Sequence, residues 1–155
     1  MTQGMTRQTR IIIALVFSIT LISLSLYAAD WTSYGKDEDG NHFYKLDTSA
    51  KPSPGIVRVL TQVMFNAEGK ARYIEKRKKY GFPTEGYDTL SHRNVLYELN
   101  CFSKKREYSV QKVYELTADG KTLDYARAGT YKDWQETPPG SMLDRLSTIV
   151  CPQKR

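Results

Sequence analysis

Two cysteines are the residues in this chain best suited to chemistry. Cys101 ends a strand-like stretch and Cys151 ends a helix-like stretch. In an oxidising compartment such a pair forms a disulfide, and closing a loop of about 50 residues would contribute ~4 kcal/mol of stability. A redox pair usually has closer spacing, and a metal site would have only His42 and His92 to complete it. We therefore expect a structural bridge, with the redox pair and the metal site as the alternatives.

Residues that could catalyse a reaction do not form a recognisable set. Ser91 and His92 are neighbours, and neighbours in a strand point to opposite faces, so they do not make a nucleophile and base pair. The acidic stretch 37–39 lacks the length of a calcium loop and precedes Gly40 as a turn would. His42 is expected on the surface of a sheet. We expect no catalytic residue, no metal, no cofactor and no enzymatic activity.

A basic cluster on a predicted helix is the best candidate for binding. Residues 76–79 are all lysine or arginine and fall in the last helical turn, where the helix dipole favours cations. Tyrosine and arginine are enriched at binding hot spots. A plain solvated helix end is the alternative interpretation. The candidate binding patch consists of Arg72, Tyr73, Lys76, Arg77, Lys78, Lys79 and Tyr80.

The first 29 residues have the pattern of an export signal. Arg7 and Arg10 precede an uncharged, apolar stretch at 11–29. Because this stretch is close to the roughly 20 residues that span a bilayer, it is either a cleaved signal peptide or a retained N-terminal anchor. Both place the chain after Asp30 outside the cytoplasm, in the periplasm or at the outer-membrane surface. No cysteine stands directly after the apolar stretch, so a lipoprotein is not expected.

The remaining chain, 30–155, has the size of one domain with its own core. The full chain has a formal net charge of +6, and the segment 30–155, which lacks Arg7 and Arg10, has about +4. This mild excess favours an anionic partner, such as a protein or an acidic glycan. It is too small to predict binding to nucleic acid.

Alternation of apolar and polar residues predicts antiparallel strands joined by short turns. The clearest strand is 56–65. The pattern predicts an α+β fold: a single domain with an antiparallel meander sheet of about six strands. The other predicted strands are 31–34, 42–46, 94–102, 107–116 and 122–127.

Two of these strands carry special positions. Cys101 would lie within strand 94–102 and point into the core. In strand 107–116, Lys112 interrupts the apolar face, and Glu115 falls on the polar face.

Two helices are predicted as well. One is inserted in the meander between Asn66 as its cap and Gly81 as its terminator. The other follows Ser141 as an amphipathic stretch and ends at Cys151, where Pro152 blocks its continuation. The disulfide would tie this C-terminal helix to one face of the sheet.

Landmarks along the whole domain occur in a distinctive order. A tryptophan follows the export segment, then come the stretches 56–59 and 97–101, Trp134, and 138–141 leading into the helix that closes on Cys151. This order resembles the surface-adhesin protein E family. The resemblance implies a sheet crossed by a disulfide-tied helix in an exported bacterial protein that can form a homodimer. In adhesin members it implies binding to host matrix or plasma glycoproteins.

These observations predict a non-catalytic interaction protein with a macromolecular partner such as a host glycoprotein. The alternative is a periplasmic or envelope module that binds a small apolar ligand or a partner peptide on the concave face of the sheet.

Overall fold

The computed structural model describes residues 31–49, 51–129 and 132–151. The predicted export segment, 1–29, lies outside the described residues, and so does the choice between signal peptide and anchor. None of the helices within these ranges has both the length and the apolar character needed to cross a membrane.

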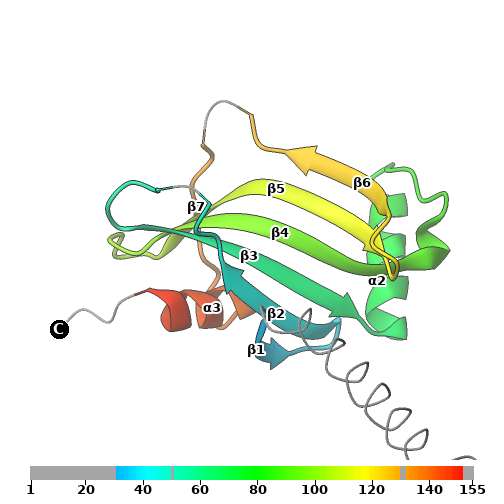
Figure 1. Ribbon diagram of the computed structural model, residues 1–155. Coiled ribbons are helices and arrows are strands. Elements are labelled where there is room, and N and C mark those ends of the chain that lie inside the picture. Colours follow the sequence, from blue (N-terminus) through cyan, green and yellow to red (C-terminus); the bar gives the residue numbers. More distant parts are fainter. Residues whose placement is uncertain (1–30, 50, 130–131, 152–155) are drawn as a thin grey trace, which may run out of the picture. The chain divides into compact units, whose positions relative to one another are not determined.

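One antiparallel sheet forms the body of the domain (Figure 1). The strands follow the order β1-β2-β3-β4-β5-β6, so each lies beside its neighbour in sequence, which confirms the predicted meander. The described residues add a seventh strand, β7, which pairs with the start of β5. The strands are β1 (Thr32–Lys36), β2 (Gly40–Leu46), β3 (Ile56–Phe65), β4 (Leu90–Asn100), β5 (Glu107–Thr117), β6 (Thr122–Arg127) and β7 (Gln135–Glu136).

The predicted strand boundaries are correct for β3 and β6 and wrong for β4. β4 begins at Leu90 and ends at Asn100. Cys101 therefore lies half-buried in the turn after the strand, and does not point into the core from within it. β7 was not predicted, because a strand of two residues carries no alternation to detect.

A β-bulge in β5 shifts its alternation by one residue. Leu96 of β4 pairs with Lys112, whereas the next residue, Tyr97, pairs with Val110. Gln111 is the extra residue between them. Such an insertion moves all later side chains of the strand to the opposite face.

The bulge reverses the predicted faces in the second half of β5. Glu115 was predicted on the polar face, but it is only 3% exposed and faces the inserted helix. Tyr114 points to the opposite side of the sheet, where its ring packs 4.8 Å from that of Tyr125 on β6. Lys112, which interrupted the apolar pattern in the sequence, lies directly beside the bulge.

The inserted helix, α2 (Ala67–Lys79), begins where the sequence predicted. The side-chain oxygen of Asn66 accepts a hydrogen bond from the Gly69 N–H at 2.7 Å. The Asn66 amide also donates to the carbonyl of Glu38 in the β1–β2 turn at 3.0 Å. Asn66 thus caps the helix and also links it to the β1–β2 turn by a hydrogen bond. The short 3-10 helix η1 (Tyr87–Thr89) precedes β4.

Gly69 provides a test of the close contact between α2 and the β1–β2 turn. A Cβ at this position would lie 2.1 Å from the carbonyl oxygen of Asp39, so the backbone would have to move. Gly69→Ala is therefore expected to lower the free energy of unfolding by about 1–3 kcal/mol, although alanine normally stabilises a helix. Urea unfolding measures the change. Ala71→Gly, at an exposed site of the same helix, is the matched variant and should cost ~1 kcal/mol. Stabilisation by Gly69→Ala would contradict the close approach of turn and helix.

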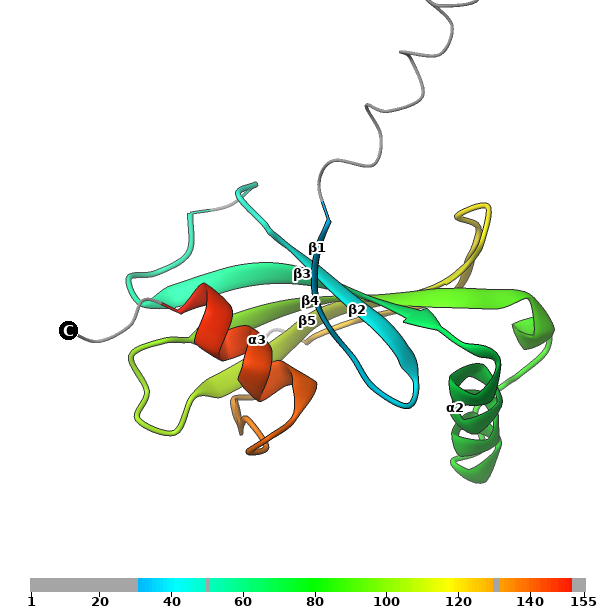
Figure 2. The same cartoon turned by 90° about the horizontal axis from the view of Figure 1, so that it is seen from below.

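The C-terminal helix, α3 (Met142–Val150), builds the apolar core at the other end of the sheet. Its Leu146 is fully buried with Val59, Leu99 and Tyr34. Ser141 is the N-cap as predicted, and its hydroxyl accepts from the Asp144 N–H at 3.1 Å. Figure 2 shows α2 and α3 on the same face of the sheet, near opposite ends of its strands.

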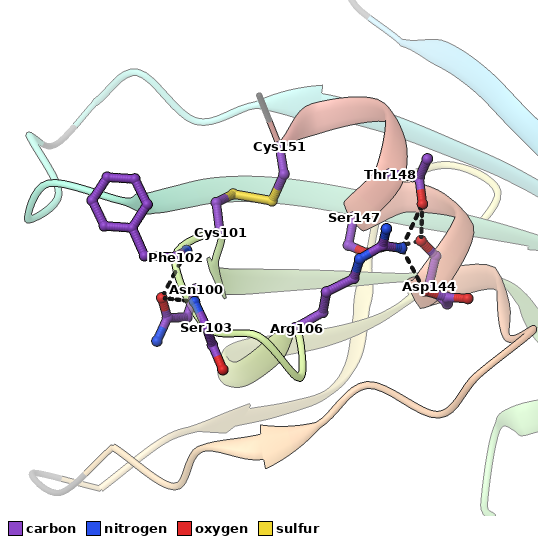
Figure 3. The surroundings of a disulfide bond; sticks show 9 residues. All are labelled: Asn100, Cys101, Phe102, Ser103, Arg106, Asp144, Ser147, Thr148 and Cys151. Atoms are coloured by element: carbon purple, nitrogen blue, oxygen red, sulfur yellow. Dashed lines mark hydrogen bonds and ion pairs between the residues drawn. A yellow bond between two sulfur atoms is a disulfide. The ribbon is translucent and has the colours of Figure 1, made fainter. Parts of the chain in front are cut away.

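The disulfide between Cys101 and Cys151 joins the β4–β5 turn to the end of α3 (Figure 3). The Cα atoms of the two residues are 5.3 Å apart. On the turn side, the Asn100 side chain accepts hydrogen bonds from the N–H groups of Phe102 and Ser103. The structural bridge is thus confirmed, and it ties α3 to the sheet.

Arg106 adds a second link between the same two elements. Its Nη1 lies 2.9 Å from the Asp144 carboxylate and 2.7 Å from the Thr148 hydroxyl of α3 (Figure 3). Arg106 adopts a left-handed backbone conformation, with φ of 49°. The turn is therefore shaped so that both Cys101 and Arg106 reach the helix.

Candidate binding surface

The seven residues of the predicted patch divide between two sides of α2. Lys76, Lys78, Lys79 and Tyr80 are exposed, and Tyr80 has 64% of its surface in solvent. Arg77 points the other way and is only 9% exposed. The continuous basic run of the sequence is therefore interrupted in space.

The two remaining patch residues are engaged within the domain. Arg72 forms an ion pair of 2.9 Å with Asp39 in the β1–β2 turn. Tyr73 is half-buried, its ring stacks on Phe65 at 5.2 Å, and its hydroxyl donates to Glu115. Four patch residues thus face outward and three hold α2 in place. Binding by the outward residues stays a prediction.

Glu115 is the centre of a buried network that the sequence did not reveal. Its carboxylate accepts hydrogen bonds from the hydroxyls of Tyr73 and Tyr87 and lies 2.9 Å from Nη1 of Arg77. Three donors therefore compensate the buried charge. Lys112 was the one signal in the sequence for the burial of Glu115. A lysine on the apolar face of a strand suggests that the faces of the following residues are exchanged.

Arg77 links this network to the edge of the sheet. Its Nη2 lies 2.8 Å from the carboxylate of Asp124 on β6. Its guanidinium lies 4.4 Å from the ring centroid of Tyr87 and 5.3 Å from that of Phe82. Burial would raise the pKa of Asp124, but hydrogen bonds from Arg77 and from the Tyr125 N–H bring it below its ordinary value. Arg77 is thus a structural residue.

The tyrosines of the network keep their protons. Burial, followed by the hydrogen bond to Glu115, raises the pKa of both Tyr73 and Tyr87. Each hydroxyl therefore stays a donor to the carboxylate over the whole physiological pH range. Both tyrosine hydroxyls therefore contribute to holding α2 on the sheet throughout that range.

His42 was predicted on the sheet surface, and this prediction is wrong. It is 6% exposed, and its Nε2 lies 2.9 Å from the Asp37 carboxylate. Burial would raise the pKa of Asp37, but hydrogen bonds from His42 and the backbone N–H groups of Asp39 and Gly40 lower it. The acidic stretch 37–39 therefore shapes the β1–β2 turn. Across the described ranges, no cluster of three or more His, Cys, Asp or Glu residues could hold a metal ion.

The family model of surface-adhesin protein E matches residues 31–152. The chain belongs to this family. The match spans every described strand and helix of this surface-adhesin protein E domain, including both cysteines. Neither a curated protein nor a solved structure matches the chain.

Membership in the surface-adhesin protein E family implies a surface adhesin-like role without catalysis. Such a role means binding a protein or glycan partner in an extracellular or surface location. The disulfide fits an extracytoplasmic site, because disulfides persist in oxidising compartments.

Proposed function

We propose that this protein is an exported adhesin that binds host matrix or plasma glycoproteins through the exposed side of α2. The α2 cationic face comprises Lys76, Lys78, Lys79 and Tyr80, with Phe82 just beyond the helix. One observation carries the proposal. Within the described residues none of these three lysines forms an ion pair, whereas both arginines of the same helix do.

Aromatic side chains beside these lysines support binding to a macromolecule. Tyr80 is 64% exposed and Phe82 is 57% exposed. Exposed aromatic anchors bury a large area when a partner docks, and flanking cations speed the approach of an acidic partner. The combination supports a protein-binding surface better than a merely solvated helix end.

The test replaces only the outward lysines at the helix end. Lys78→Gln with Lys79→Gln is expected to weaken binding to immobilised matrix and plasma glycoproteins by about tenfold at low salt. The salt dependence of binding should also flatten. Surface plasmon resonance at several salt concentrations measures both effects.

The matched control is Lys51→Gln with Lys104→Gln. These two exposed lysines lie in the β2–β3 and β4–β5 connections, at the other end of the sheet from α2. The control should leave glycoprotein binding unchanged. Equal binding by the α2 variant and the wild type would make the cationic face a solubilising helix end.

Location and assembly are part of the same proposal. We expect the protein in the periplasm or at the outer-membrane surface, without a lipid anchor, and with the N-terminal segment either cleaved or kept in the membrane. A homodimer is compatible with this role, whereas nucleic acid is not an expected partner. Protease shaving of intact cells separates the two locations, because only protein at the surface is cleaved.

A second candidate function is a module that binds a partner on the face of the sheet. A hollow of about 320 Å³ between α2, β5 and β6 favours it. Charged residues, including Arg93 and Glu115, line this hollow, so it suits a partner peptide better than a small apolar ligand.

A further inference from the structure

The hollow beside α2 continues along the face of the sheet. It has a volume of about 320 Å³ and shares Val113 and Ala126 with a second hollow of about 300 Å³. The second hollow extends past Val110 to Gln135 of β7. We name the two together the α2–β6 groove. Its middle has an apolar floor formed by Val110, Val113 and Ala126.

Two cations without ion pairs lie at the α2 end of this groove. Arg93 of β4 stands between Val63 and Glu115 in the sheet register, and its guanidinium lies 5.1 Å from the Tyr73 ring centroid. Lys76 lines the same hollow from α2. In the described part of the chain neither residue forms an ion pair, and the buried Nε of Arg93 has no hydrogen-bond acceptor. Two neighbouring cations without an ion pair favour an anionic ligand.

The two carboxylates at the α2 end of the groove, Glu115 and Asp124, bind Arg77 and form no ion pair with Arg93 or Lys76 within the described residues. Glu115 accepts from Arg77 and from two tyrosines, and Asp124 takes the other end of the same guanidinium. Arg77 is thereby shared between two carboxylates. With the single charge of Arg77 set against two carboxylates, Arg93 and Lys76 leave this hollow with an excess of one positive charge for a ligand.

We propose that the α2–β6 groove binds an extended acidic segment of a protein partner. One carboxylate would bind Arg93 and Lys76, and a neighbouring apolar side chain would lie over Val113 and Ala126. Arginine suits a carboxylate because its planar fork can donate two parallel hydrogen bonds. The proposal rests on the second candidate function, a partner peptide bound on the face of the sheet, and adds the chemistry of that peptide and the residues that bind it.

The composition of the groove favours a peptide over an acidic glycan. A glycan presents many hydroxyls and requires many hydrogen-bonding side chains. Most polar groups in the walls of the groove are already bonded to one another, and Val110, Val113 and Ala126 offer none. A chain that alternates carboxylates with apolar side chains matches both the cations and the floor.

The experiment titrates the full exported protein and follows the methyl resonances of Val113 and Ala126 by NMR. The first probe is a capped seven-residue peptide of alternating leucine and aspartate. The second is the same peptide with asparagine in place of aspartate, and the third is a heparin hexasaccharide. We expect the acidic peptide to shift both methyl resonances, and the asparagine peptide to bind about tenfold more weakly.

Variants connect the effect to the two cations. Lys76→Gln and Arg93→Gln should each weaken binding of the acidic peptide by about tenfold. Lys51→Gln with Lys104→Gln, at the other end of the sheet from α2, should leave binding of the acidic peptide unchanged. Lys76 is exposed, so its variant keeps the fold even where Arg93→Gln is destabilised.

Three results would overturn the proposal. They are an acidic peptide that leaves the two methyl resonances unshifted, equal binding of the two peptides, and stronger shifts of the same methyls by the hexasaccharide. Failure of the proposed function looks different, since it is seen as unchanged glycoprotein binding by the Lys78 and Lys79 variant. The peptide titration requires no glycoprotein, so the two outcomes are separate.

Discussion

Replacing Arg77 with methionine is expected to lower the free energy of unfolding by about 3–5 kcal/mol. The change removes the guanidinium that lies 2.9 Å from Glu115 and 2.8 Å from Asp124. Glu115 would stay buried under α2 with only two tyrosine hydroxyls to compensate its charge. Losing one partner of a buried pair costs more than the pair contributes, because the other charge is left without compensation. Urea unfolding followed by circular dichroism measures the loss.

Two variants make this result specific. Lys78→Met changes the neighbouring exposed lysine and should alter stability by no more than about 0.5 kcal/mol. Adding Glu115→Gln to Arg77→Met should recover part of the loss, because no buried charge is then left unpaired. A loss below ~1 kcal/mol for Arg77→Met would show that the guanidinium is solvated. A binding test that replaced all of 76–79 would therefore confuse unfolding with loss of contacts.

Replacing Cys101 and Cys151 together with serine should lower the free energy of unfolding by about 4 kcal/mol. The bridge closes a loop with a sequence separation of 50, and without it the unfolded chain gains entropy. It also pins α3, whose Leu146 fills the core beside Val59 and Leu99. Guanidinium unfolding of the oxidised wild type and the double variant measures the difference. Thiol titration of the denatured, unreduced wild type should detect no free thiol.

Arg106→Gln is the matched control for the bridge. It removes the second link between the β4–β5 turn and α3 and leaves the disulfide intact. Because the Arg106–Asp144 pair is exposed to solvent, its loss should cost far less than the loss of the bridge. If the cysteine variant were as stable as the Arg106 variant, the disulfide would not be what holds α3.

Patterns within single segments predicted much of this fold. The alternation in 56–65 predicted the bounds of β3, and the turn at Asp119 and Gly120 predicted where β6 begins. Asn66 and Ser141 marked the first turns of α2 and α3, because a cap depends on a side chain only three residues from the N–H that it accepts. The disulfide was predicted from the export signal, which indicates an oxidising compartment, and from the strand-like and helix-like stretches that end at the two cysteines. Family membership agrees with the same order of elements.

The candidate site was predicted less completely, since the sequence showed the basic run 76–79 but not the direction of each side chain. Arg77 turns inward because Glu115 and Asp124 lie beneath it, and both come from strands far along the chain. His42 is buried for a similar reason, since Asp37 and Tyr34 contact it across the β1–β2 pair. No local pattern contains that information.

By itself the sequence determined the six strands of the meander apart from the bounds of β4, the two helices with their caps, the cysteine pair and the family, because each depends on residues close together or on their order along the chain. The tertiary structure alone decided which face each side chain of β5 occupies. The bulge at Gln111 is defined by pairing with β4, and a one-residue shift moves every later side chain to the other face. That shift places Glu115 under α2, draws Arg77 inward, and leaves Arg93 and Lys76 in an open groove.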